Sequence, residues 1–408
     1  MKALVIAGGL PQIELIKQLK ERGIEALLAD GSACAVARPY ADKFYHVDVF
    51  NIEAIKQIAV SEKVDFLITV CADQVLLVVA EVSEMLGLPC YIDFETGMNV
   101  SDKIRMKRIF KKGGVPTTDY IETDQLDMDA IAHLKYPLVV KPVDAYSSKG
   151  VRKAENEAEL RLYYEEAHKI SRSGGVIVEE FFSGEEVSVD AFVVNGKAVI
   201  LNVSSSEKVR GKDRFVIFRG HYPAKVSEKV MKKIEDVVQK IVDVFELVNA
   251  PLLVQLLNNG DEISVLEFCA RTGGQMKYLL IKYASGVDVI GATIDITLGK
   301  EPDLSQKAPT HNVVVNDFVY CNPGTFDHFE GFEELKAAGV INEFFPVRQK
   351  GTYMHGVMNS SDRIAGINVV ADTLSEYNEK LMRINNTVMV MDDKGNDIMR
   401  HDLLPELH

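Results

Sequence analysis

Apolar and polar positions alternate over the first hundred residues in the order strand, helix, strand. Apolar runs at 3–7, 24–28 and 64–70 are followed by segments at 13–19, 52–60 and 75–86 in which apolar residues recur every three or four positions. Strands that alternate with helices form parallel sheets through right-handed crossovers. The sequence therefore predicts an open parallel-sheet domain over residues 1–100.

The pattern changes near Ser101, where short strands begin to come in pairs with few helices between them. Asn-Gly pairs at 195–196 and 259–260 separate alternating segments, which predicts tight antiparallel hairpins. Further strands are expected at 137–142, 176–182 and 313–319, and further helices at 227–247 and 375–383. We therefore expect an α/β protein whose part beyond residue 100 is of the α+β kind.

The composition favours a globular protein that binds small molecules. Of the 408 residues 47% are hydrophobic, and the formal net charge of -14 argues against an extended basic surface for nucleic acid or anionic lipid. No stretch approaches the roughly 18 to 20 apolar residues of a membrane span, and residues 1–9 are too short for the apolar part of a secretion signal. The 5 scattered cysteines contain no C-x-x-C pair, which suits a reducing compartment. We expect a cytoplasmic protein with no membrane or nucleic-acid partner.

Lys141 is the first candidate for a ligand contact. It stands at the end of an apolar strand, where an ammonium group is costly unless an anion meets it. The loop that follows offers hydroxyl and backbone N–H donors at Ser147, Ser148 and Gly150, which suits phosphate binding. A second ammonium, Lys103, lies about forty residues upstream on a helix capped by Ser101 or Asp102. The alternative is a surface loop with lysines in water.

Acidic residues mark the next strand end. Glu179, Glu180 and Glu186 flank a Ser-Gly turn, where carboxylates can accept hydrogen bonds from ribose hydroxyls or an exocyclic amine, and Phe182 can lie against a purine. An acidic hairpin in water explains this segment equally well.

Oxygen ligands and an arginine follow on the second predicted hairpin. If Asn259-Gly260 closes it, Gln255 and Glu267 lie on opposed strands, and the alternation places Glu267, Cys269 and Arg271 on one face. Carboxylate and amide oxygens suit magnesium, and Arg271 is placed to clamp a carboxylate or phosphoryl group. The backbone of Gly273 and Gly274 is expected beside an acyl group. Arg219 and His221 form a further basic pair for a carboxylate or phosphate, with a solvated loop as the alternative.

The order of these motifs resembles the ATP-grasp superfamily, in particular the branch with biotin carboxylase, the carbamoyl-phosphate synthetase large subunit and the bacterial L-amino-acid ligases. The resemblance implies an ATP-grasp domain over 101–300 with a lid lobe at about 115–185, and a C-terminal α/β subdomain over 301–408 that completes the substrate lobe. It also implies a two-lobed fold with antiparallel sheets.

The same resemblance implies a role for each matching residue. Lys103 and Lys141 correspond to the lysines that hold the ATP phosphates, with Lys141 also catalytic, and Ser147, Ser148 and Gly150 to the lid loop. Adenine and ribose are expected at Glu179, Glu180, Phe182 and Glu186. Magnesium, with manganese as the alternative, is expected at Gln255 and Glu267, and the acyl phosphate at Arg271. Cys269 departs from the family, which usually has an asparagine ligand there. The second metal would then depend on Glu267 and phosphate oxygens alone, with a weakened site as the alternative.

The implied activity is that of an ATP-dependent carboxylate–amine ligase acting through an acyl phosphate on amino-acid-like substrates. Two alternatives stay open: a bicarbonate-using carboxylase or carbamoyl-phosphate synthetase-like enzyme, and an ATP-binding regulatory subunit without catalysis. A homodimer is expected by family likeness.

Overall fold

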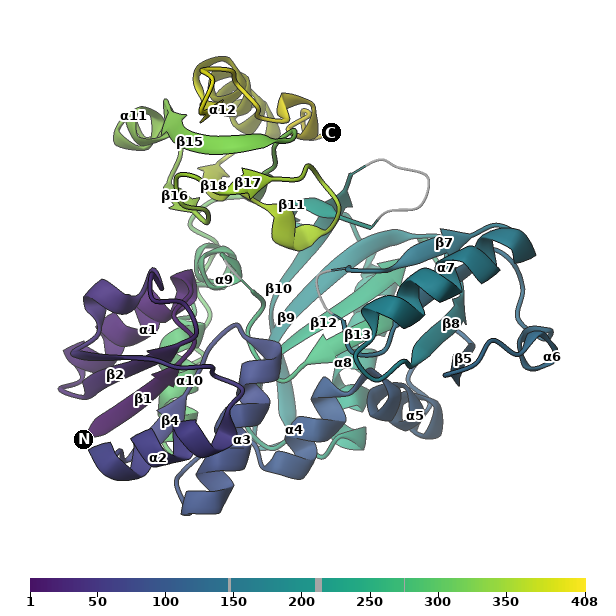
Figure 1. The fold of residues 1–408 in the computed structure, drawn as a ribbon, viewed down its shortest axis with the longest axis horizontal. Helices are drawn as coiled ribbons and strands as arrows, with labels where there is room; N and C mark the ends of the chain where they lie inside the picture. Colours follow the sequence, from purple (N-terminus) through teal and green to yellow (C-terminus); the bar gives the residue numbers. More distant parts are fainter. Residues whose placement is uncertain (146–147, 210–214, 275) are drawn as a thin grey trace.

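The computed structural model describes residues 1–145, 148–209, 215–274 and 276–408. An eight-stranded sheet forms the centre, with the N-terminal domain on one side, a small lobe on the other and the C-terminal subdomain above (Figure 1). Ser147, predicted for the lid loop, lies outside the described residues.

The N-terminal domain is the parallel sheet that the alternation predicts, with strand order β3-β2-β1-β4. Its strands are β1 (Lys2–Ile6), β2 (Glu25–Asp30), β3 (Lys43–His46) and β4 (Phe66–Ile68). Alternate residues of β1 enter different cores: Ala3 and Val5 pack under α1 (Leu10–Glu21), and Leu4 and Ile6 pack under α2 (Ile52–Glu62) and α3 (Asp73–Leu86). Helix α10 (Val289–Thr297) returns from far along the chain to close the first of these cores.

The small lobe is an antiparallel sheet of order β5-β8-β6-β7. Its strands are β5 (Tyr120–Thr123), β6 (Leu138–Pro142), β7 (Arg152–Ala154) and β8 (Val176–Glu180). Helix α7 (Glu157–Ile170) covers one face, and α6 (Met128–Ile131) lies at the edge of the same core. Helices α4 (Phe94–Ser101) and α5 (Lys103–Gly113) connect this lobe with the N-terminal domain.

The central sheet has the order β13-β12-β9-β10-β11-β14-β18-β16 and is antiparallel throughout. Both Asn-Gly hairpins are present, one joining β9 (Glu185–Val194) to β10 (Lys197–Lys208) and one joining β12 (Ala250–Asn258) to β13 (Ile263–Cys269). Strand β9 presents apolar side chains on one face of the sheet and polar side chains on the other. Val187, Val189 and Ala191 enter the core beneath α8 (Glu228–Val244), while Glu186, Ser188 and Asp190 alternate with them and point to the other face.

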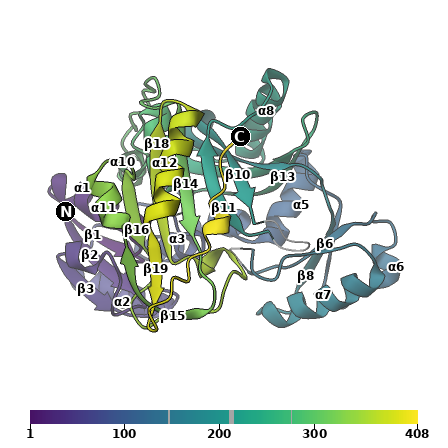
Figure 2. The ribbon, with the colours of Figure 1, turned by 90° about the horizontal axis from the view of Figure 1, so that it is seen from above.

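The C-terminal part adds β14 (Val313–Val319), β18 (Ala365–Ala371) and β16 (Glu343–Pro346) to this sheet, next to β11 (Ile217–Tyr222). Helix α12 (Leu374–Thr387) packs on β14 and β18 (Figure 2). A three-stranded sheet lies beside them, made of β17 (Tyr353–Met354), β15 (Gly324–Glu330) and β19 (Met389–Asp392). The remaining helices are α9 (Lys277–Ser285), α11 (Phe332–Ala337) and the short η1 (Arg38–Tyr40), η2 (Ser360–Asp362) and η3 (His401–Leu403). None of the described helices combines the length and the apolar character needed to cross a bilayer.

Candidate active site

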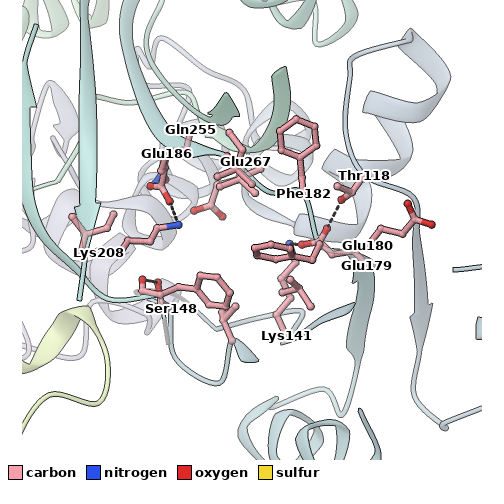
Figure 3. A pocket seen from close by; sticks show the side chains of 18 of the residues that line it. Thr118, Lys141, Ser148, Glu179, Glu180, Phe182, Glu186, Lys208, Gln255 and Glu267 are labelled. Carbon is pink, nitrogen blue, oxygen red and sulfur yellow. Dashed lines mark hydrogen bonds and ion pairs between the residues drawn. The ribbon is translucent and has the colours of Figure 1, made fainter. Parts of the chain in front are cut away.

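A cavity of about 400 Å³ lies between the small lobe and the central sheet (Figure 3). Strands β6 and β8 form one wall, and β9, β12 and β13 form the other. Most of the residues predicted for nucleotide and metal binding line it together, namely Lys103, Lys141, Ser148, Glu179, Glu180, Phe182, Glu186, Gln255 and Glu267. Residues from five separate stretches of the chain therefore meet in one cleft between two lobes.

Gly150 does not line this cavity, and its expected role as a phosphate donor stays a prediction. Its φ of +74° is one that side chains rarely adopt, and a Cβ there would come within 2.9 Å of the Ile170 Cδ1 atom. The glycine serves the turn after β6 by its conformation and its lack of a side chain. Ser148 in the same turn does line the cavity, and its hydroxyl donates to the carbonyl oxygen of Phe215 at 3.0 Å.

Lys103 reaches the cavity because α5 begins beside it. The Asp102 carboxylate caps this helix by accepting from the N–H groups of Ile104 and Arg105. The Lys103 Nζ then donates to the carbonyl oxygen of Ala145 at 2.6 Å and lies 3.9 Å from Glu267 Oε2. One ammonium group thus joins the small lobe to the central sheet at the edge of the cavity.

Glu179 is held between two lysines at the end of β8. Its Oε1 lies 2.5 Å from Lys141 Nζ and its Oε2 lies 2.5 Å from Lys107 Nζ, with all three groups largely buried. Burial alone would raise the pKa of Glu179, but the two ammonium groups lower it to about 2. Burial also lowers the pKa of Lys107, despite the nearby carboxylate. The Glu179 carboxylate therefore positions Lys141, and only its main chain is left to meet a ligand.

Replacing Glu179 by Gln should destabilise the protein by about 3–5 kcal/mol near neutral pH, because two buried ammonium groups lose their counter-charge. The Glu179 pKa is about 2 in the fold, against an ordinary 4.5. A lowered pKa stabilises above the ordinary value, so the difference should stay constant above about pH 5 and shrink as the pH falls toward 2. Chemical denaturation of both variants across this range measures it. Glu122→Gln, which removes the exposed partner of Arg108, should cost less than about 1 kcal/mol. A difference that does not vary with pH would contradict the assignment.

Glu180 and Phe182 take different positions. The Glu180 carboxylate turns out of the cavity, where its Oε1 accepts from the Lys135 N–H at 3.0 Å (Figure 3). The Phe182 side chain lies at the cavity wall. Contacts from Glu179 and Glu180 to a ligand are thus left to the main chain, since both carboxylates are engaged by the protein.

Glu186 is bonded on both oxygens. Lys208 Nζ lies 2.6 Å from its Oε2, and the Gln255 Nε2 donates to its Oε1 at 3.0 Å. Because the amide nitrogen of Gln255 is used in this way, its carbonyl oxygen is the atom left to face the cavity. Gln255 and Glu267 lie on opposed strands, as the hairpin predicts, and a register shift between Gln255 and Leu256 places them directly opposite each other.

The oxygen atoms of Gln255 and Glu267 fit magnesium, which is bound through one or two protein groups and keeps water or phosphate oxygens as its other ligands. Among the described residues no group of three or more His, Cys, Asp or Glu side chains is placed to hold an ion unaided. Cys269 does not add a ligand. Burial raises the pKa of its thiol well above the ordinary value, and a thiol is a poor ligand for a hard cation.

Arg271 lies in a second cavity of about 400 Å³, which shares Lys103, Ser148, Gln255 and Glu267 with the first. Its Nε donates to Asp73 Oδ1 at 2.5 Å, and its Nη1 donates to the Thr272 carbonyl oxygen at 2.9 Å. Burial would lower the pKa of Arg271, but the carboxylate of Asp73 raises it above the ordinary value. The guanidinium is therefore a fixed positive group in the cavity that Gln255 and Glu267 also line.

Gly273 and Gly274 also line the second cavity, together with Lys277. A Cβ on Gly273 would come within 2.6 Å of the Lys277 Cγ atom, so only glycine fits there. The Lys277 Nζ in turn donates to Asp190 Oδ2 at 3.1 Å and to the Ser204 hydroxyl at 2.6 Å.

Arg219 and His221 do not reach either cavity, which contradicts their predicted role as substrate contacts. Arg219 is fully buried between β10 and β14, with its Nε 2.6 Å from Asp317 Oδ1. His221 lies 3.8 Å from Glu207, and burial together with the charge of Arg219 lowers its pKa to about 4. The basic pair belongs to the core between the central sheet and α12.

Polar residues of the site that escaped the sequence prediction include Asp73, Lys107, Lys208 and Lys277. Lys107 was visible as a charge on the helix of Lys103, one turn further on, and Lys208 as part of a charged segment. Neither pattern indicates the partner, because Glu179 and Glu186 come from other strands. Asp73 and Lys277 have no local signal at all.

Comparisons with known proteins show which family and which folds this chain is similar to. Residues 134–278 match the family described as "ATP-grasp domain". Curated relatives include a carbamoyl-phosphate synthase of Methanobrevibacter smithii, 27% identical over 45% of this chain and 50% of the relative, and a phosphoribosylamine–glycine ligase of Lactococcus lactis, 28% identical over 51% of this chain and 54% of the relative. The chain thus spans about half the length of these relatives. The crystal structure of an L-amino acid ligase from Bacillus licheniformis shares the fold, with a TM-score of 0.82 at 20% identity, covering 96% of this chain and 98% of that one.

The fold and the site are those of a two-lobed protein with a cleft between its lobes, and the segment 134–278 matches the ATP-grasp domain family. The relatives of this chain include a carbamoyl-phosphate synthase and an L-amino acid ligase, and a biotin carboxylase domain shares its fold.

Proposed function

We propose that this protein is an ATP-dependent carboxylate–amine ligase that joins amino-acid-like substrates through an acyl phosphate. The observation that carries the proposal is the meeting of Lys103, Lys141 and Glu267 in one cleft. Two ammonium groups and an oxygen ligand for a divalent ion surround a single space, as the neutralisation of a triphosphate requires.

The chemistry consists of two displacements. A carboxylate oxygen attacks the γ-phosphorus of ATP, the bridging P–O bond breaks, and ADP leaves with the electron pair. An amine nitrogen then attacks the acyl carbon, the C–O bond breaks, and phosphate leaves while the amine proton passes to it or to water. Bound magnesium would neutralise phosphate charge between Gln255 and Glu267, with manganese as its substitute.

The protein's own residues position and neutralise the reactants. Lys141, held by Glu179, and Lys103, held by the Ala145 carbonyl, meet the phosphates from two sides. Arg271 faces the transferring group from the second cavity with its orientation fixed by Asp73. Glu186 and Phe182 receive ribose and adenine in this proposal. The lid turn around Ser148 keeps water away from the acyl phosphate.

Two other functions remain in the same superfamily. Carbamoyl-phosphate synthase is among the relatives, so bicarbonate as the activated carboxylate is the second candidate. Cys269 in place of the usual ligand is what favours a non-catalytic ATP-binding subunit. The described contacts argue against that third candidate, since Arg271 keeps its bond to Asp73, and Lys103, Lys141 and Glu267 line one cavity.

A phosphate-release screen with ATP, magnesium and pairs of amino acids tests the proposal. We expect release to require both a carboxylate and an amine, because each displacement needs its nucleophile. Release that depends on bicarbonate would instead support the second candidate. Nucleotide binding with no release from any pair would support the third. The homodimer and the cytoplasmic location are part of the proposal by family likeness, and sedimentation would test the first of them.

A further inference from the structure

Arg363 enters the second cavity from the C-terminal subdomain and is not used by the chemistry above. It follows the short helix η2 directly, and its guanidinium carbon lies 3.6 Å from the centre of the Phe318 ring. Its Nε donates to the Tyr320 hydroxyl at 3.1 Å. The hydroxyl is committed to accept this bond, since it donates its own proton to the Ile217 carbonyl oxygen at 2.8 Å. The guanidinium is thus fixed on one face and one edge.

The other edge of this guanidinium is what indicates a ligand. Throughout the described part of the chain, no carboxylate pairs with Arg363, and neither Nη atom has a recorded hydrogen bond. The acid next to it is occupied, because Asp362 Oδ2 accepts from the N–H groups of Met358 and Asn359 at 2.8 Å each. An arginine held through Nε and its ring face presents two parallel N–H groups, which match the two oxygens of a carboxylate or phosphate.

The other charges around this cavity already have partners. Arg271 is bonded to Asp73, Lys277 to Asp190, and Lys103 to the Ala145 carbonyl. The Asp144 carboxylate accepts from backbone N–H groups at Arg172 and Ser173. Arg363 is therefore the cation of this cavity, among the described residues, that an incoming anion meets without displacing an acid.

The position of Arg363 indicates which substrate it meets. Glu267 lies in β13 and Phe318 in β14, and β12, β9, β10 and β11 stand between them in the sheet. Carboxylate activation takes place at the Glu267 side, next to the phosphates. An anion held at the Phe318 side is therefore a different group from the carboxylate that becomes the acyl phosphate.

From these contacts we infer that Arg363 binds an oxyanion on the amine substrate, a carboxylate or a phosphate monoester that is kept in the product. The inference rests on the proposed ligase function for the role of the amine, and the anion site itself rests on the contacts of Arg363. By this inference, the second cavity binds an amine that bears an anionic group. Amines without an anionic group are then not the preferred substrates.

Titration of the full-length protein with three small amines tests the inference without turnover. In the presence of ADP and magnesium, β-alanine carries a carboxylate, O-phosphoethanolamine carries a phosphate, and ethanolamine carries neither. We expect calorimetry to detect at least one of the two anionic amines and to show ethanolamine binding at least tenfold more weakly. Whichever of the two anionic amines binds more tightly indicates whether the anionic group of the natural amine substrate is a carboxylate or a phosphate.

Variants of Arg363 complete the test. Arg363→Gln should weaken the anionic amines by roughly tenfold or more, because a charged bidentate pair is lost, and should leave ADP affinity unchanged. Arg363→Lys keeps the positive charge but loses the two parallel N–H groups, so it should also weaken binding of the anionic amines. If thermal denaturation shows that the Gln variant is unfolded, the affinity of the Lys variant is the deciding measurement. Arg383→Gln removes an exposed charge on α12 and should change nothing.

Equal binding of ethanolamine, no binding of either anionic amine, or unchanged affinity in both Arg363 variants would overturn the inference. These results are distinct from failure of the proposed function. A protein that binds the anionic amines through Arg363 but releases no phosphate from any substrate pair would retain the anion site and lose the ligase assignment.

Discussion

Replacing Glu267 by Gln should lower ATP-dependent phosphate release by about 10²–10³-fold and raise the magnesium concentration needed for half-maximal rate. The amide keeps the shape of the side chain but removes the negative charge that Gln255, a neutral neighbour, cannot replace. Lys103, 3.9 Å from Glu267 Oε2, would also lose its nearby carboxylate. The rate measured against magnesium concentration at saturating ATP gives both quantities.

The matched control is Glu262→Gln on the hairpin before β13. Glu262 is exposed and pairs with Lys233 at 2.7 Å, so removal of its charge should leave rate and magnesium dependence unchanged. Binding of ADP without magnesium should be similar in the wild type and in both variants. Full turnover of the Glu267→Gln variant at the magnesium concentration that suffices for the wild type would contradict the assignment of Glu267 as a metal ligand.

Replacing Arg271 by Lys should depress turnover by about 10²-fold with little change in ATP affinity, because the guanidinium acts on charge that develops in the transition state. Lysine keeps the positive charge beside Asp73. It cannot reproduce the bonds from Nε to Asp73 at 2.5 Å and from Nη1 to the Thr272 carbonyl at 2.9 Å. Steady-state kinetics together with nucleotide titration separate the two effects.

Arg105→Lys is the control for this second variant. Arg105 lies on α5 and pairs with Glu95 at 2.9 Å in an exposed position, so the same substitution there should leave both parameters unchanged. Parallel losses of turnover and nucleotide affinity in Arg271→Lys would place Arg271 in nucleotide binding and would count against its assignment to the transferring group.

Local patterns in the sequence predicted much of this arrangement. The Asn-Gly turn at 259–260 and the alternation on either side of it were enough to place Gln255 and Glu267 on paired strands, whereas their direct pairing depends on an irregularity between Gln255 and Leu256 that shifts the register. The parallel sheet of the N-terminal domain followed in the same way from the spacing of apolar residues. The gathering of Lys103 and Lys141 at that hairpin depended on resemblance to a family, because no local rule connects the three segments.

The prediction that Arg219 and His221 contact a substrate was wrong for the same reason. Charge density in the segment indicated a binding loop, whereas the fold places β11 beside β14 and buries Arg219 against Asp317, 98 residues further along the chain. The local sequence around a basic residue does not distinguish a residue that binds a ligand from one that pairs with a distant carboxylate. Arg363 is the opposite case, a residue without any motif whose Nη atoms have no partner among the described residues, and only the folded chain shows this.

The sequence by itself determined the elements of this protein: which segments are strands, where hairpins turn, and which side chains share a strand face. These depend on neighbours within a few residues, through backbone geometry and the burial of apolar side chains. Only the tertiary structure decided the partners of the charged groups. Whether Glu179 binds a ligand or holds Lys141, and whether Arg271 is free or fixed by Asp73, depends on contacts between remote segments, since a buried charge is stable only beside the group that the fold brings to it.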